Sequence, residues 1–298
     1  MTAKLLLLEV IILHIQTGKD KSIMKKAIVL VVLVGLIFYF VDMQFSEKRV
    51  LRIGVECDYV PNSWLEHEQT DSNLPISNDP EHFAEGYDIQ IAKLVAAELG
   101  AKLEVRKILW DNLLDELNDG TIDAIFSGML DTEPRKERAA FSETYDSVDN
   151  IFVILLKKGS SYLSARSISD FSGAKIVGQS GTILDDLIAQ MPDVVHLNPA
   201  DSVTAMVNMV IDGHADGAVI NLDTAEAYQR KFDDLRLIRF SESDGFSVNF
   251  TGTCAAVRKR DTKLLYDINK AIHGISKWDR QRVMDRTIAR AWRHLPEN

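Results

Sequence analysis

The segment Thr121–Tyr145 contains residues whose order could form a binding site for an anion. A short apolar strand, Ile122–Phe126, ends at Ser127 and Gly128, and a basic, helix-like segment containing Arg135 follows a few residues later. Backbone amides and a guanidinium group at such a junction can converge on a carboxylate. We therefore predict that Arg135 binds an anionic group. The alternative is that Arg135 and the basic residues after it form a solvated helix face.

A second candidate anion site follows the predicted strand Lys175–Val177. The glycine-rich turn Gly178–Thr182 comes next, and an amphipathic helix begins after it. A glycine turn at a helix N-terminus presents backbone amides to an anion. A Walker motif needs a lysine at the helix start, and this sequence has none at that position. We therefore do not expect a nucleotide ligand.

Two aromatic residues flank a turn at the end of the first predicted strand. In the stretch ECDYVPNSW, Pro61 and Asn62 favour the turn, with Tyr59 before it and Trp64 after it. Aromatic side chains on a loop at a strand end often form the wall of a ligand site. They serve as a local cap on the core about as often, and the sequence leaves both interpretations open.

The first half of the chain is predicted to alternate strands and helices. The expected elements are strand Val50–Val55, a helix that stops at Gly100, strand Leu103–Ile108, a helix capped by Asp111 that ends at Gly120, and strand Ile122–Phe126. This order implies parallel strands joined by right-handed crossovers. Ligands bind beyond the carboxyl ends of such strands, where the loops carrying Tyr59 and Arg135 lie. The anion interpretation of Arg135 is therefore favoured. Between these elements, the polar stretch Leu65–Glu85 is too long for a tight connection.

The second half repeats the pattern and then returns to the first. The expected elements are strand Ile151–Leu156, strand Lys175–Val177, strand Val194–Leu197, a helix capped by Ser202, strand Ala218–Ile220, an extended segment Phe246–Phe250, strand Cys254–Val257, and helices Leu264–Ile275 and Asp279–Trp292. The last two helices have apolar faces that we expect to pack on the first sheet. The chain then crosses between two α/β lobes twice, near Tyr145–Asp149 and near Asn249–Thr253. Residues 51–146 with 254–298 form the predicted lobe 1, and residues 147–253 form lobe 2. A two-strand hinge with ligand in the cleft is a common closure design.

Composition and charge exclude several classes of protein. The 298 residues carry a net charge of -10 and no basic stripe, which argues against nucleic-acid binding. Cys57 and Cys254 are the two cysteines, too few for a disulfide framework or a metal cluster, so we expect buried thiols or one long-range disulfide. His67 and His82 lack the spacing of a metal motif. We expect neither a metal nor a cofactor.

The N-terminal region is predicted to anchor the protein in a membrane. Ala27–Val41 is free of charge and follows Lys25 and Lys26, which is typical of a signal sequence or signal anchor. No small-x-small cleavage site or lipid-attachment cysteine follows. We therefore predict an uncleaved anchor over residues 24–45, with the rest of the chain on the extracytoplasmic side of the cell membrane. Residues 1–23 fit poorly, and we interpret them as an extension upstream of a true start at Met24.

Taken together, the motifs resemble those of a known family. The stretches that carry the resemblance are LRIGVECDYVPNSW, EGYDIQIAKLVAAELG, WDNLLDELNDGTIDAIFSGM, PRKERAAFSETY, VGQSGT and AAVRKRDTKLLYDINKAI. Over about Leu51–Trp292, the sequence resembles the family-3 extracellular solute-binding proteins, the polar-amino-acid receptors of bacterial ABC importers. The resemblance implies an α/β, two-lobed type II periplasmic-binding-protein fold. It also implies a small-molecule ligand, an amino acid or carboxylate, and an ABC permease as partner.

The resemblance also implies roles for individual residues. Arg135 would pair with the α-carboxylate of the ligand, and Ser127 and Gly128 would add hydroxyl and backbone contacts. The amides of Gly181 and Thr182 would reach the same carboxylate. Tyr59, with Trp64 close by, would form an aromatic wall of the site. Glu56 would contact an amine on the side chain of the ligand.

Two positions depart from the family pattern. Leu130 occupies the place of a serine or threonine hydroxyl, and Asn221 the place of the acid that pairs with the ligand's α-ammonium group. An amide offers an oxygen but no charge, so this pairing is weaker. Asp223 could substitute, or it could interact with the helix N-terminus. A carboxylate ligand without an α-ammonium group would therefore fit as well.

The leading interpretation is a membrane-tethered binding protein that delivers its ligand to an importer, and it is not an enzyme. One alternative is a sensory or regulatory ectodomain that signals without transport. Another is an enzyme on the same scaffold, such as a dehydratase, for which Glu56 and Asp58 are the candidate acid–base residues.

Overall fold

The computed structural model describes residue 29 and residues 32–35, 49–145, 151–248 and 252–291, and the chain divides into two compact units, residues 1–48 and 49–298. In the first unit, the described residues are helical, and Val29, Val32 and Leu33 expose their side chains. The predicted extension over 1–23 and most of the predicted anchor over 24–45 lie outside the described residues. Within the part of the chain that is described, no helix is both long enough and apolar enough to cross a membrane.

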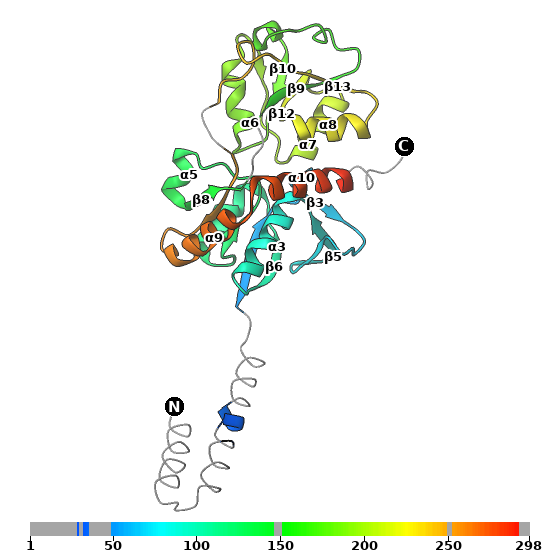
Figure 1. The fold of residues 1–298 in the computed structure, drawn as a ribbon. Helices are drawn as coiled ribbons and strands as arrows, with labels where there is room; N and C mark the ends of the chain where they lie inside the picture. Colours follow the sequence, from blue (N-terminus) through cyan, green and yellow to red (C-terminus); the bar gives the residue numbers. More distant parts are fainter. Residues whose placement is uncertain (1–28, 30–31, 36–48, 146–150, 249–251, 292–298) are drawn as a thin grey trace, which may run out of the picture. The chain divides into compact units, whose positions relative to one another are not determined.

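The second unit contains two sheets, each with helices packed against it (Figure 1). In the described residues, the larger sheet has nine strands in the order β2-β3-β5-β4-β6-β1-β7-β14-β8. Its strands are β1 (Val50–Val55), β2 (Asp58–Tyr59), β3 (Ser63–Glu66), β4 (Leu74–Ile76), β5 (Asp79–Glu85), β6 (Lys102–Lys107), β7 (Ala124–Ile125), β8 (Ala140–Thr144) and β14 (Cys254–Val257). As predicted, β1 pairs in parallel with β6 and β7. Strand β14 joins this sheet antiparallel to β7 and β8, so the end of the chain returns to the first lobe.

Residues 65–85 form structure that the sequence analysis did not identify. Strands β3, β4 and β5 extend the sheet through antiparallel pairs, and β4 joins β6 in parallel at Ile76. These strands are short, and β4 contains a proline and a half-exposed leucine. Edge strands that face water on one side tolerate polar residues and proline, which hides their pattern in the sequence.

Helices cover both faces of the larger sheet. They are α3 (Tyr87–Glu98), the short 3-10 helix η1 (Trp110–Asn112), α4 (Leu113–Asp119), α5 (Glu133–Arg138), α9 (Thr262–Gly274) and α10 (Lys277–Ala291). The closing helices α9 and α10 bury Ile268, Ile272 and Met284 in the same core as β1, which confirms their predicted partner surface. Leu113 and Leu117 of α4 belong to a separate core cluster with Ile125 of β7.

The termini of these helices agree with the sequence except at Asp111. Gly120 adopts the left-handed conformation with φ 85° at the end of α4, as a glycine stop requires. However, α4 begins after Asn112, and Asp111 lies within η1 without capping α4. The prediction of Asp111 as a helix cap was wrong. The Asp111 carboxylate instead faces the second lobe, where the hydroxyl of Ser180 donates to it at 3.4 Å.

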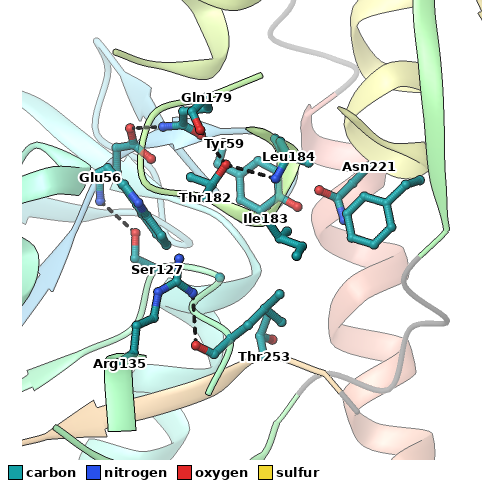
Figure 2. Close-up of a pocket in the computed structure, with 14 residues that line it drawn as sticks. Glu56, Tyr59, Ser127, Arg135, Gln179, Thr182, Ile183, Leu184, Asn221 and Thr253 are labelled. Atoms are coloured by element: carbon teal, nitrogen blue, oxygen red, sulfur yellow. Dashed lines mark hydrogen bonds between the residues drawn. The ribbon is translucent and has the colours of Figure 1, made fainter. Parts of the chain in front are cut away.

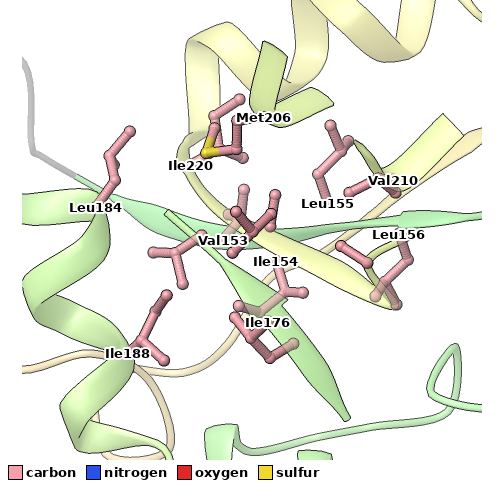
Figure 3. Packing of buried hydrophobic residues seen from close by; sticks show 14 of the residues in the cluster. Val153, Ile154, Leu155, Leu156, Ile176, Leu184, Ile188, Met206, Val210 and Ile220 are labelled. Carbon is pink, nitrogen blue, oxygen red and sulfur yellow. The ribbon is translucent and has the colours of Figure 1, made fainter. Parts of the chain in front are cut away.

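The smaller sheet organises the second lobe. In the described part of the chain its order is β11-β10-β12-β9-β13, formed by β9 (Phe152–Lys157), β10 (Lys175–Val177), β11 (Val195–His196), β12 (Gly217–Asn221) and β13 (Leu235–Ile238). The helices are η2 (Ile168–Phe171), α6 (Ile183–Asp186), η3 (Leu187–Gln190), α7 (Val203–Ile211) and α8 (Leu222–Lys231). Strand β13, which we did not predict, pairs antiparallel with β9. Figure 3 shows Met206, Val210, Leu184 and Ile188 of the helices packed around the strand residues 153–156.

The two chain crossings fall largely outside the described residues, at 146–150 and 249–251. The residues beside them are joined, because the amide of Tyr145 donates to the carbonyl of Thr253 at 3.0 Å. The crossings therefore begin side by side, and the lobe boundaries near 146 and 253 stay a prediction. Cys57 and Cys254 are both buried and free, which confirms the prediction of buried thiols.

Candidate ligand-binding site

A cavity of about 40 Å³ lies where the two sheets face each other. This volume would hold roughly three water molecules. The cavity is lined by side chains from the carboxyl ends of strands and from the loops that follow them: Glu56, Tyr59, Trp110, Ser127, Gly128, Leu130, Arg135, Phe152, Gln179, Thr182, Ile183, Leu184, Asn221 and Thr253. Arg135 and Glu56 each form a hydrogen bond to the second lobe here, so a ligand that pairs with either side chain would replace that bond.

Most residues that the sequence singled out converge on this cavity. Those that line it are Glu56, Tyr59, Ser127, Gly128, Arg135, Thr182 and Asn221. Gly181 borders it through its carbonyl oxygen, which accepts hydrogen bonds from Trp110 Nε1 at 3.1 Å and from Arg135 Nη2 at 2.9 Å. Its close packing depends on the absence of a side chain, since a Cβ would lie 2.9 Å from Asp111 Oδ1.

Trp64 is not in the cavity. In the β2–β3 hairpin Trp64 lies opposite Asp58, and Tyr59 lies opposite Ser63. Side chains alternate between the two faces of a strand, so Trp64 shares the face of Asp58 and not that of Tyr59. Trp64 lines a separate cavity and donates its indole N–H to Glu66 Oε1 at 2.7 Å.

Several lining residues were missed by the sequence analysis. Trp110 follows the carboxyl end of β6, so the rule that indicated Glu56 and Arg135 would also have indicated it. Gln179 lies in the glycine turn that was considered only for its backbone amides. Phe152 and Thr253 lie beside the crossings, and Ile183 and Leu184 begin α6. These residues line the cavity because the two lobes lie close together there, and no pattern in the neighbouring sequence indicates that closeness.

Arg135 occupies the centre of the first-lobe wall. Its Nη1 donates to the carbonyl of Leu130 at 3.0 Å, its Nη2 donates across the lobes to Gly181, and its guanidinium lies 5.1 Å from the Trp110 ring centroid. Burial lowers the pKa of Arg135 to about 10, and Asp186 opposes this change. The group therefore remains charged at neutral pH. Lys136 and Arg138, by contrast, are exposed and paired with carboxylates, so the solvated-face interpretation holds for them.

Among the described residues that line the cavity, Glu56 alone carries a carboxyl group. Its side chain is 6% exposed, and Oε1 accepts a hydrogen bond from Gln179 Nε2 of the second lobe at 2.8 Å. Burial, and then the charge of Asp58, raises the pKa of Glu56 to about 8. A buried carboxyl of this kind is mostly protonated at neutral pH and ionises when a cation lies next to it.

The hydroxyl groups near the cavity are engaged within the protein. Thr182 Oγ1 donates to the carbonyl of Gln179 at 2.8 Å and accepts from the amide of Leu184 at 3.1 Å, so Thr182 caps α6. The amide of Thr182 donates within the same turn. Ser127 Oγ accepts from the amide of Glu56 at 3.0 Å (Figure 2). In this conformation, therefore, Thr182 stabilises the start of α6, and Ser127 joins its loop to the end of β1 at Glu56.

The two departures from the family pattern lie in the cavity wall. The Leu130 side chain is 5% exposed and makes this part of the wall apolar. Asn221 lines the cavity and begins α8. Asp223 is not among the lining residues, and its pKa is raised by burial and then by Glu226. Among the described lining residues, Asn221 thus offers an uncharged amide on the second-lobe side, and Glu56 offers a carboxyl group on the first-lobe side.

Fold, site and sequence agree with one class of protein. The family model for bacterial extracellular solute-binding proteins, family 3, matches residues 51–286. The chain belongs to this family. Its two-lobed fold matches that of an amino acid ABC transporter substrate-binding protein, AbpA from Streptococcus pneumoniae, solved with bound L-arginine. That match has a TM-score of 0.69 at 19% identity and covers 83% of this chain and 97% of the other.

Relatives of known activity include binders and an enzyme. The arginine-binding extracellular protein ArtP of Bacillus subtilis is 26% identical over 229 residues, which cover 76% of this chain and 81% of ArtP. A cyclohexadienyl dehydratase of Pseudomonas aeruginosa is 27% identical over 170 residues, covering 57% of this chain and 58% of the enzyme. The scaffold therefore supports binding and, in at least one relative, catalysis.

Proposed function

We propose that the protein is an extracytoplasmic solute-binding protein that captures an amino acid with a cationic side chain for an ABC importer. The observation that carries this proposal is that a guanidinium and a carboxyl group line one cavity. Arg135 supplies a partly buried guanidinium for the α-carboxylate, and Glu56 supplies a buried carboxyl for a cation. The rings of Tyr59 and Trp110 line the space between lobes, and aromatic faces attract cations. The arginine-binding relatives support the same ligand class.

Ligand binding is tested by thermal shift and calorimetry on residues 49–298 with arginine, lysine, glutamine, glutamate and a carboxylate that lacks an ammonium group. A ligand at 100 times its Kd should stabilise the protein by about 2.7 kcal/mol. We expect arginine or lysine to give the largest shift. Failure of every ligand in this panel to stabilise the protein would contradict the proposal.

Arg135→Ala should abolish this binding. The substitution removes the charge that would hold the carboxylate, whereas Arg138→Ala removes an exposed arginine of the same helix that pairs with Asp115. We expect the Arg138 variant to bind as the wild type does. If the Arg135 variant keeps its affinity, the carboxylate lies elsewhere.

We also propose that residues 24–45 tether the protein to the cell membrane, with the true start at Met24. The apolar run and the exposed apolar side chains of Val29, Val32 and Leu33 support this proposal. Fractionation should find the protein in membranes after an alkaline carbonate wash, and deletion of residues 1–48 should release it. Recovery of the full-length protein in the wash would refute the tether. A native peptide from within residues 1–21 would refute the start at Met24.

A dehydratase activity is the second candidate function. The buried Glu56, with a pKa raised to about 8, has the protonation behaviour of a general acid, and one relative is a dehydratase. Incubating the protein with each stabilising ligand and analysing the mixture by mass spectrometry separates the two functions. A binder returns the ligand unchanged, whereas an enzyme loses turnover in Glu56→Gln.

A further inference from the structure

A second contact joins the lobes outside the ligand cavity. The carboxylate of Asp58, on β2 of the first lobe, accepts hydrogen bonds from the amide of Thr204 at 3.0 Å and from the Thr204 hydroxyl. Thr204 begins α7 of the second lobe, and its hydroxyl lies 3.0 Å from the hydroxyl of Tyr228 on α8. We call the Asp58–Thr204 contact the clasp.

The clasp satisfies a helix terminus that otherwise depends on water. The first amides of a helix have no partner within the helix. In α7, the side chain of Ser202 accepts from the amide of Ala205, and the amide of Thr204 is satisfied by Asp58 of the other lobe. A carboxylate at a helix N-terminus also interacts favourably with the helix dipole. Charge-assisted hydrogen bonds of this kind are the stronger ones in proteins.

The clasp and the ligand cavity lie on opposite faces of one short strand. Tyr59 lines the ligand cavity, whereas Asp58 lines a separate cavity of about 240 Å³ that also includes Thr204 and Tyr228. A ligand that binds Arg135 would replace the contact between Arg135 and Gly181. It would leave the clasp intact, because no atom of the clasp lines the ligand cavity. The clasp therefore stabilises the closed arrangement both with and without ligand.

We propose that Asp58 is a positioning residue that sets how fast the ligand enters and leaves the cavity by holding the two lobes together, without touching the ligand. This inference rests on the proposed binding function. Breaking the clasp should speed ligand dissociation about tenfold and should also speed association, since the lobes must open both for release and for entry. The effect is limited to about this size because Thr204 is exposed and water competes for the carboxylate.

Two variants separate the clasp from the charge of Asp58. Asp58→Ala removes both hydrogen bonds and a negative charge near Glu56, whereas Thr204→Val removes the hydroxyl contacts to Asp58 and Tyr228 but keeps the amide bond and the charge. Asp79→Ala is the matched control, because Asp79 is a first-lobe carboxylate bonded within its own lobe to His82 at 2.8 Å. Stopped-flow dissociation of arginine should be faster in both clasp variants and unchanged in the control.

A second measurement tests the clasp without any ligand. Fluorescent labels on the two lobes of the full chain report the distance between them, and both clasp variants should shift this distance toward the open value. If wild type binds no amino acid but the variants still open, the proposed function fails and the clasp stands. If neither Asp58→Ala nor Thr204→Val changes the dissociation rate or the interlobe distance, the clasp has no role and the proposal is overturned.

Discussion

The pH dependence of ligand affinity should reveal whether the side chain of the ligand is charged, because Glu56 is buried when the lobes are closed. In the closed arrangement, the pKa of Glu56 rises from its usual 4.5 to about 8. When the lobes separate, water reaches the carboxyl and the pKa returns toward 4.5. At 1.36 kcal/mol per pKa unit, closing over an ionised Glu56 without a nearby cation is unfavourable by about 5 kcal/mol. At pH 7 the carboxyl can instead take up a proton as the lobes close, which limits the unfavourable free energy of closure to about 3 kcal/mol.

Ligands with neutral side chains and ligands with cationic side chains should therefore differ in how their affinity depends on pH. For a ligand with a neutral side chain, closure takes up a proton at Glu56. The stabilisation of the closed complex is then fully present below pH 4.5 and is lost as the pH rises toward 8. Affinity should fall about tenfold per pH unit across this window. A cationic side chain beside Glu56 keeps the carboxylate ionised in both states, so its affinity should be nearly constant over the same window.

Calorimetry with arginine and glutamine at pH 5.5 and 7.5, at constant ionic strength, tests this reasoning. We expect the Kd of glutamine to weaken about 100-fold between these pH values and that of arginine to change by less than about threefold. Glu56→Gln cannot ionise, so its glutamine affinity should no longer depend on pH. The reasoning is refuted if wild type binds glutamine equally well at both pH values, or if the variant retains the wild-type pH dependence.

Two further substitutions test the packing on which the site depends. Gly181→Ala places a Cβ 2.9 Å from Asp111 Oδ1 of the other lobe, at φ +65°, so the exposed Asp111 side chain must move and the ligand Kd should weaken about threefold in calorimetry. Gly173→Ala, which also has positive φ but nothing within 4 Å, is the control and should bind normally. Ile154→Ala, fully buried in the second-lobe core, should lower the free energy of unfolding by about 3 kcal/mol in urea titration. Val195→Ala, at 49% exposure, should change it by less than about 1 kcal/mol, and an equal loss in both variants would contradict the assigned core.

Local sequence signals predicted most of the elements that carry the site. Helical spacing and the stop at Gly120 located α4, and Ser202 was correctly predicted to cap α7. The rule that ligands bind at the carboxyl ends of parallel strands indicated Glu56, Tyr59 and Arg135 together. These signals succeed because helix caps, glycine stops and apolar periodicity depend on neighbours within a few positions.

The sequence failed where a side chain's surroundings come from distant segments. Trp64 and Tyr59 belong to one hairpin, but the register of β2 and β3 places them on opposite faces. Asp111 has the residue type of a helix cap and instead faces Ser180 of the other lobe. The strands over 65–85 have a polar composition because the edge of the sheet is partly solvated, so their apolar pattern is weak.

By itself, the sequence determined the family, the alternation of strands and helices, and the presence of Arg135 at a strand end. Only the tertiary structure decided what surrounds these residues. It buries Glu56 against Gln179, 123 positions away, and joins Asp58 to Thr204, 146 positions away. The pKa of Glu56 and the strength of the clasp depend on solvent exclusion and on the distance between lobes. Both are properties of packing between segments that no local pattern encodes.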